Sequence, residues 1–151
     1  MTRFGPGDEE CRATGAVAII DAYDLRPWRL DLKSNWKPAG FYRLPARNRA
    51  ALHIIANQLG GANYTLRNFV AGYQSPANTP DMRGLEDEVA KAAQSQRVLY
   101  AVLPVYGASD PAISTELRMY AVGDRGYRLN CTVYNRSSGG YSCFERSFGG
   151  N

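Results

Sequence analysis

The sequence is poor in three residue types that often carry chemistry: it has one histidine, three cysteines and three lysines. An odd cysteine count in a short chain gives no disulfide framework, and none of the three has the spacing of a metal-binding motif. Cys131 and Cys143 could pair across a hairpin, but free buried thiols fit their setting equally well. No glycine-rich phosphate loop and no Gly-x-Ser-x-Gly motif occurs, so the common nucleotide-binding and serine-hydrolase motifs are missing.

Long hydrophobic runs are also missing. No stretch approaches the roughly 20 apolar residues that a membrane helix needs, so no membrane association is predicted. The first ten residues, MTRFGPGDEE, contain acidic side chains and no apolar run, and we expect no signal peptide within this chain. We interpret residues 1–10 as a flexible lead-in and residues 11–151 as a single domain.

The charge balance is mildly basic, with a net charge of +4 and arginine far more frequent than lysine. This charge could serve solubility alone. It could also serve a polyanionic partner, because arginine makes planar, bidentate contacts with phosphate.

The hydrophobic pattern predicts an α+β fold with an antiparallel β-sheet and one main helix at about 79–95. Asn78 and Thr79 are cap candidates for this helix, and Pro80 suits its first position. The helix carries one apolar stripe, made of Met82, Leu85, Val89 and Ala92 or Ala93. The remaining expected elements are a buried strand at 13–20, an irregular segment at 21–40, a stretch of helical composition at 47–59, a short strand at 66–73, and strands at 97–106, 114–123, 126–135 and 141–147.

Two residues stand out as candidates for chemistry. His53 is either an ordinary packed imidazole or the one side chain that moves a proton near neutral pH. Glu86 falls on the flank of the apolar stripe, along the same edge as Asn78. It is either an edge glutamate that reaches water or part of a one-metal site, because an unpaired buried charge is costly.

Four stretches, taken together and in order, indicate a family. They are HIIANQLGG, LRNFVAGYQ, the spaced set Asn78, Met82, Glu86 and Val89, and VLYAVLPVY. In this order they resemble the bacterial DNA/RNA non-specific endonucleases, which are ββα-metal (His-Me finger) nucleases. The likeness spans roughly residues 11–135. It is greatest to the nuclease domains of actinobacterial polymorphic toxins, in which ATGA and GDRGYRL also have counterparts.

The resemblance implies a role for each matching residue. His53 matches the general base and Asn78 the sole protein ligand of Mg²⁺, for which Mn²⁺ is an alternative. Glu86 matches the carboxylate that holds water on the metal, and Asn68 matches an asparagine that supports the catalytic site. In this family the residue two before the histidine is usually arginine, whereas this chain has Ala51 there.

Three basic residues are candidates for nucleic-acid contact: Arg49, Arg83 and Lys91. Some relatives carry an arginine four residues after the glutamate, where this chain has Ala90. The resemblance implies a ββα-metal finger within the sheet fold. It also implies that residues 47–52 are extended rather than helical.

The implied function is metal-dependent, sequence-non-specific cleavage of DNA or RNA by a protein that is secreted or delivered into a target cell as a toxin domain. An immunity protein is then a candidate partner. The alternative is a nucleic-acid-binding module that keeps the fold but no longer cleaves, and Ala51 and Ala90 favour it.

Overall fold

The computed structural model describes residues 1–25 and 36–148. Its larger sheet is antiparallel and has six strands. In spatial order these are β1 (Thr2–Phe4), β2 (Ala16–Ile20), β5 (Val98–Tyr106), β6 (Ser114–Gly123), β7 (Tyr127–Tyr134) and β8 (Tyr141–Phe148). Strands β3 (Arg49–His53) and β4 (Phe69–Tyr73) form a separate antiparallel hairpin, and α1 (Arg83–Ala93) is the one α-helix of the described chain. Shorter helical stretches are η1 (Phe41–Arg43), η2 (Asn57–Leu59), η3 (Leu66–Asn68) and η4 (Gln74–Met82).

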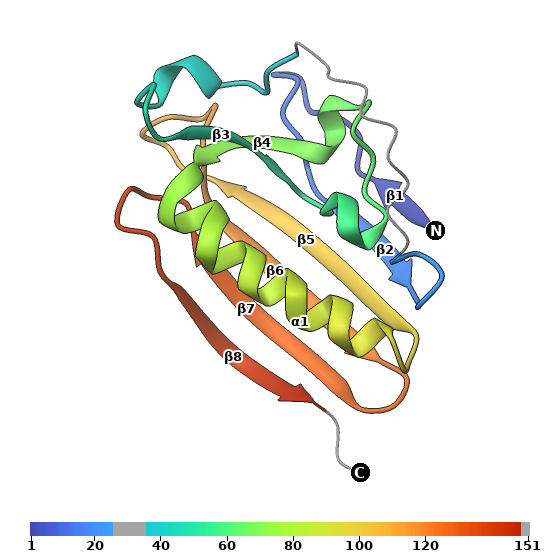
Figure 1. Ribbon diagram of the computed structural model, residues 1–151. Helices are drawn as coiled ribbons and strands as arrows, with labels where there is room; N and C mark the ends of the chain where they lie inside the picture. The colour runs from blue at the N-terminus through green and yellow to red at the C-terminus, as the bar shows by residue number, and fades with distance from the viewer. Residues whose placement is uncertain (26–35, 149–151) are drawn as a thin grey trace.

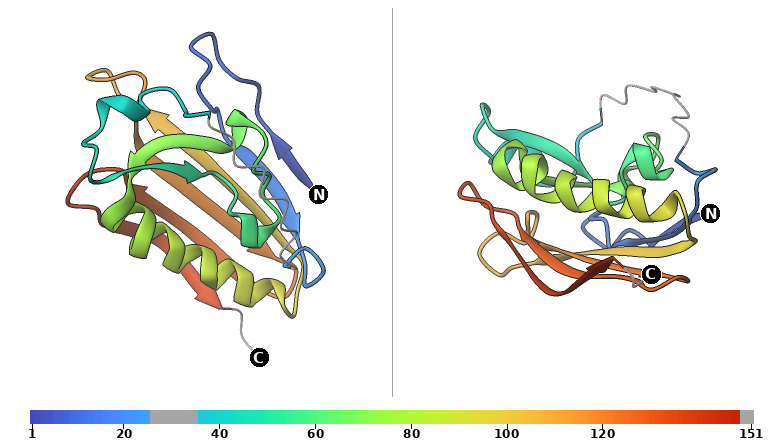
Figure 2. Two further views of the ribbon diagram at one scale, coloured as in Figure 1. Left: turned by 45° about the horizontal axis from the view of Figure 1, so that its top comes forward. Right: turned by 60° about the horizontal axis from the view of Figure 1, so that its bottom comes forward.

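These elements form two layers (Figures 1 and 2). Helix α1 and the β3–β4 hairpin cover one face of the six-stranded sheet, and β1 and β8 are its two edges. The chain order β3, β4, α1 is the ββα order that the sequence predicts. The predicted α+β fold, with one antiparallel sheet and one main helix, is therefore confirmed.

The core lies between the two layers and follows the period of each element. In β5, Val98, Tyr100 and Val102 face the helix and are fully buried, while the residues between them face outward. The predicted stripe of α1, from Met82 to Ala93, is buried against this sheet face. Every second residue of the strand and one stripe of the helix are apolar. Packing these two faces together produces the two layers.

The main helix begins close to its predicted start. Within η4, only Ser75 and Thr79 leave helical backbone angles, and Thr79 has φ −136° and ψ 118°. Helical backbone therefore resumes at Pro80, the residue expected in the first turn, and continues through α1. Extended angles at the residue before the first turn are those of an N-cap.

The helical composition of residues 47–59 is misleading. Arg49–His53 form strand β3, which pairs with β4 so that His53 lies opposite Phe69. Leu52 is completely buried, and Ala50 packs against the same core. Cross-strand pairing and burial of one face outweigh the weak helical preference of these residues. The extended backbone implied by the family resemblance is what the structure contains.

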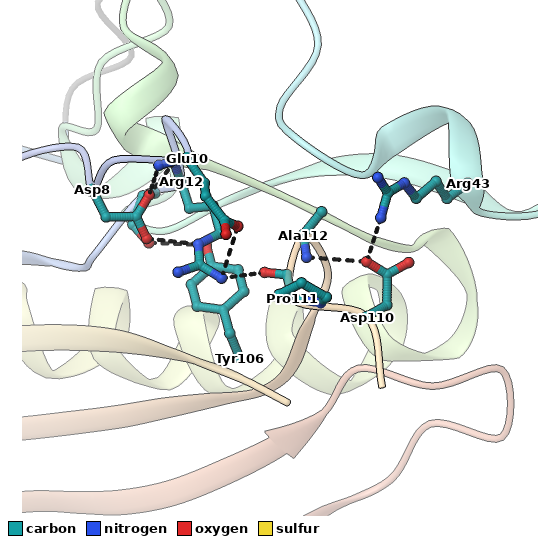
Figure 3. Close-up of polar contacts among 9 residues, drawn as sticks. Asp8, Glu10, Arg12, Arg43, Tyr106, Asp110, Pro111 and Ala112 are labelled. Carbon is teal, nitrogen blue, oxygen red and sulfur yellow. Dashed lines mark hydrogen bonds and ion pairs between the residues drawn. The ribbon is translucent and has the colours of Figure 1, made fainter. Parts of the chain in front are cut away.

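Residues 1–10, expected to be a flexible lead-in, contain an edge strand. Thr2–Phe4 pair with Ala16–Ala18 as edge strand β1. The segment after β1 is held by Arg12, which bonds Asp8, forms an ion pair with Glu10, donates to the Pro111 carbonyl and stacks on Tyr106 (Figure 3). One guanidinium thus attaches the N-terminal segment to the loop between β5 and β6.

Cys131 and Cys143 form a disulfide between β7 and β8, which decides the alternative that the sequence leaves open. Cys11 is free and exposed. Part of the predicted irregular segment 21–40 lies outside the described residues. In the described chain, no helix is long and apolar enough to cross a membrane.

Candidate active site

His53 ends strand β3 and is held from two sides. Its Nε2 lies 2.8 Å from Oδ1 of Asn63, and its ring packs against Phe69 with centroids 4.5 Å apart. An amide oxygen can only accept, so Nε2 carries the proton and donates, and Nδ1 keeps its lone pair. Burial lowers the pKa of His53 from 6.5, and the hydrogen bond to Asn63 partly opposes this shift. The ring is therefore neutral at pH 7, and its Nδ1 can accept a proton.

The Gly60–Gly61 turn brings Asn63 back to His53. Gly60 has φ +81°, a left-handed conformation that favours glycine. At Gly61, an added Cβ would lie 1.8 Å from the Ile55 carbonyl oxygen, so no side chain fits. The sequence pointed to the Gly-Gly turn but not to Asn63. Its only signal is an amide placed directly after the turn that follows the histidine.

Asn68 organises the same loop from within. It is completely buried. Its Oδ1 accepts from the Ile55 N–H at 2.8 Å, and its Nδ2 donates to the carbonyls of Ile55 and Ala62 at 3.0 and 2.8 Å. Every polar atom of the side chain is engaged with backbone, so Asn68 fixes the loop that carries Asn63. Its amide oxygen and nitrogen are thus both bonded to backbone rather than turned to the surface.

Asn78 lies just before the helix and presents a free oxygen. Its Nδ2 donates to Oε1 of Gln74 at 3.1 Å, and no described residue bonds its Oδ1. The segment is fixed to the start of β3, because the Asn48 side chain both accepts from the N–H of Ser75 and donates to its carbonyl. An amide oxygen on an anchored loop can serve as a ligand for a hard divalent cation.

Glu86 is the unusual residue of α1. It is only 6 % exposed, and within residues 1–25 and 36–148 nothing hydrogen-bonds its carboxyl group. Burial raises its pKa to about 8, an effect that the charge of Arg83 opposes and that of Asp87 increases. At neutral pH Glu86 is therefore mainly protonated in the metal-free protein. A cation nearby would favour the carboxylate form.

The three basic candidates occupy different settings. Arg83 donates from Nε to Asp87 at 2.9 Å, and Lys91 is exposed farther along α1. Arg49 lies over the rings of Phe41 and Tyr42, at 5.1 and 4.9 Å from their centroids. Arg49 and Lys91 thus keep charges at the surface, while the charge of Arg83 is partly neutralised within the helix.

The predicted residues fall into two groups. His53 and Asn68 belong to the loop of the hairpin, while Asn78 and Glu86 belong to the helix and the segment before it. The groups are joined where Gln58, in η2, donates to Asp87 beside Glu86 at 2.9 Å. This bond connects the segment after β3 directly to the helix.

The chain belongs to the DNA/RNA non-specific endonuclease family, whose model matches residues 4–122. This places it among nucleases that act on DNA or RNA without sequence specificity. No curated protein matches the sequence.

Solved nucleases share the fold. NucA from Streptococcus agalactiae, with magnesium bound, has a TM-score of 0.76 and 21% identity, over 91% of this chain and 71% of its own. The Sda1 nuclease, with a bound zinc ion, has a TM-score of 0.77 and 17% identity, over 90% of this chain and 75% of its own. An extracellular nuclease has a TM-score of 0.55 and 21% identity, over 85% of this chain and 70% of its own. At these identities the likeness concerns the fold.

The protonation of Glu86 can be tested through stability. Because its folded pKa is raised to about 8 from 4.5, the folded chain keeps a proton that the unfolded chain releases. Stability from this group is therefore complete below pH 4.5 and is lost as pH rises toward 8. Relative to Glu86→Gln, the free energy of unfolding of the parent should fall by on the order of 1 kcal/mol per pH unit in this window. Urea unfolding in chelator measures it.

Glu145→Gln is the matched control, since Glu145 is exposed on β8. This variant should keep the parent's dependence on pH. If the Glu86→Gln and parent curves run parallel from pH 5 to pH 8, then Glu86 is ionised in the metal-free protein.

Proposed function

We propose that this protein is a metal-dependent, sequence-non-specific endonuclease in which His53 is the general base. The observation that carries the proposal is the state of His53. The ring is neutral, Nε2 is occupied by Asn63, and Nδ1 is left to accept a proton. The family to which the chain belongs supplies the substrate class, DNA or RNA.

In this mechanism His53 takes a proton from the attacking water through Nδ1, and the water oxygen attacks phosphorus in line. Asn63 and Phe69 keep the ring in one orientation during the transfer. Asn68 acts on His53 indirectly, because it holds the loop that positions Asn63. The bond from phosphorus to the 3′ oxygen breaks, and that oxygen takes a proton from solvent. The products are a 5′-phosphate and a free 3′-hydroxyl.

The helix side of the site fits a divalent cation. Asn78 would hold it through Oδ1, and Glu86 would act through the surrounding water, which gives a reason for a buried carboxyl group without a partner. Mg²⁺ keeps most of its own waters and needs only one or two protein oxygens, and Mn²⁺ is an alternative. The bound ion would stabilise the charge of the pentacoordinate phosphate and of the leaving oxygen.

Binding of the substrate rests on contacts with phosphate. Arg49, Arg83 and Lys91 supply positive charge from the hairpin and the helix. Contacts of this kind position a nucleic acid without reading its sequence, and they weaken as salt rises.

His53→Ala tests the catalytic role. General-base catalysis contributes typically 10²–10⁴-fold, so nicking of plasmid DNA in Mg²⁺ should fall by about that factor. Salt-dependent binding to the plasmid should survive, because the ring is not a phosphate contact. Cleavage by the variant at the parent's rate would exclude His53 as the base. A parent that binds but does not cleave in Mg²⁺ or Mn²⁺ would instead be the catalytically inactive binding module.

Asn78→Ala tests the cation site. The variant should lose most turnover and need more Mg²⁺ for the remainder. Its thermal unfolding should stay close to that of the parent, because Asn78 makes only one side-chain hydrogen bond to the residues that the structure describes. Glu86→Ala should retain more activity than Asn78→Ala, since it acts through water. The measurement is the cleavage rate against Mg²⁺ concentration for all three proteins. Full activity of the parent in chelator would remove the metal from the mechanism.

We further propose that the protein is secreted or delivered into a target cell, as a toxin domain of the polymorphic-toxin kind neutralised by an immunity protein. Two similar structures are described as an extracellular nuclease and an extracellular endonuclease, which supports release from the cell. Expression of the chain alone in bacterial cytoplasm should then degrade nucleic acid and stop growth, and His53→Ala should restore growth. Normal growth with active nuclease in the lysate would contradict the toxin role.

A further inference from the structure

An exposed aromatic surface lies beside the hairpin, and its two rings have no part in the mechanism above, which uses only the charge of Arg49. It consists of Lys37, Phe41, Tyr42 and Arg49, and we call it the Tyr42 platform. Phe41 and Tyr42 meet edge to face, with centroids 5.2 Å apart. Arg49 lies over both rings, and Lys37 lies 5.1 Å from the centroid of Phe41. Tyr42 is nevertheless 71% exposed.

Two contacts hold the backbone of the platform against the loop between β5 and β6. Gly40, just before η1, has φ +78°, and an added Cβ would lie 2.7 Å from Cγ1 of Ile113 and 2.8 Å from the Ala112 carbonyl oxygen. Arg43, at the end of η1, forms an ion pair with Asp110 at 2.8 Å (Figure 3). Both contacts join η1 to the loop between β5 and β6, so the backbone that carries the two rings is attached on both sides.

Strand β3 connects the platform to His53. Arg49 and His53 are four residues apart on β3 and therefore point to the same face of the strand. At about 3.3 Å per residue, the Cα atoms of Arg49 and His53 are roughly 13 Å apart. A few nucleotides of an extended strand span such a length. A strand whose phosphate lies at His53 can thus bring one of its own bases to Tyr42.

We propose that the Tyr42 platform binds an unpaired base by stacking, and that the protein therefore cleaves single-stranded DNA or RNA in preference to intact duplex. This inference rests on the proposed function. Arg49 and Lys37 supply positive charge beside the ring for the flanking phosphates. Aromatic side chains set in a positive surface are the usual means of binding single strands without sequence preference. Within a duplex the base is already stacked and paired, and freeing it costs a few kcal/mol.

The test compares Tyr42→Ala with the parent on a labelled single-stranded oligonucleotide and on a duplex of the same sequence, in Mg²⁺. Loss of one stacked base weakens binding of a single strand roughly 10-fold. We therefore expect kcat/KM on the single strand to fall by about that factor, mainly because KM rises. Cleavage of the duplex should change far less. Tyr42→Phe, which keeps a ring, should behave as the parent does.

Phe144→Ala is the matched control, because Phe144 is an exposed aromatic residue, 92% exposed, on edge strand β8. It should leave both substrates unaffected. If the parent cleaves both substrates and Tyr42→Ala cleaves the single strand equally well, the inference fails while the nuclease function stands. An equal loss on both substrates, or a Tyr42→Phe variant as weak as Tyr42→Ala, also overturns it. A parent that cleaves neither substrate contradicts the proposed function itself.

Discussion

The position of the β3–β4 hairpin depends on one rule: a buried polar group must find hydrogen-bond partners. Asn135, 6% exposed at the end of β7, satisfies this rule by joining the two sheets. Its Oδ1 accepts from the N–H of Tyr73 at 3.0 Å, and its Nδ2 donates to the carbonyls of Ala71 and Ser114 at 3.0 and 2.7 Å. Gly72 between them leaves room for this approach, since a Cβ there would lie 2.6 Å from the amide oxygen. Removing the amide would take one partner from three backbone groups, two of them in buried bonds, and an unsatisfied buried group costs about 1–3 kcal/mol. The amide of Asn68 repeats the same solution in the loop after His53.

The helix side of the site breaks the rule that the hairpin obeys. Glu86 is buried with no bond to its carboxyl group from the described residues, and below it the phenol oxygen of Tyr100 is buried without a partner. Each burial raises the pKa of its group, and the two groups interact electrostatically. The phenol oxygen of Tyr127 is buried without a partner in the described chain as well, so this feature alone does not mark a site. A carboxyl group whose pKa is strongly raised by burial is more typical of functional sites. On the proposed mechanism, the cation and its waters supply the partner that Glu86 lacks, so this part of the helix is organised for a ligand.

The sequence predicted where most helices and strands lie better than it predicted which segments pair or make contact. The stripe from Met82 to Val89 and the alternation in β5 specify buried faces by period alone, and both are confirmed. The helical reading of residues 47–59 failed, because short-range composition does not record that β4 pairs with this stretch. The candidates His53, Asn78 and Glu86 came from an ordered set of motifs, and the structure shows which of their atoms are free. Asn63 and the Tyr42 platform could not be predicted, since each depends on a loop that returns across more than five residues of chain.

Because the chain has a single histidine and its ring is neutral, positive charge near the reacting phosphate must come from other groups. Burial lowers the pKa of His53, and the hydrogen bond to Asn63, a neutral amide rather than a carboxylate, opposes this shift only in part, so Nδ1 is free near neutral pH. The same neutrality means that the ring brings no positive charge to the phosphate before it takes the proton. Ala51, on the same face of β3, offers none, and Arg49 is held over Phe41 and Tyr42, roughly 13 Å along the strand. In the proposed mechanism the work is therefore divided. The cation at Asn78 neutralises the reacting phosphate, while Arg49 and its aromatic neighbours hold the strand a few nucleotides away.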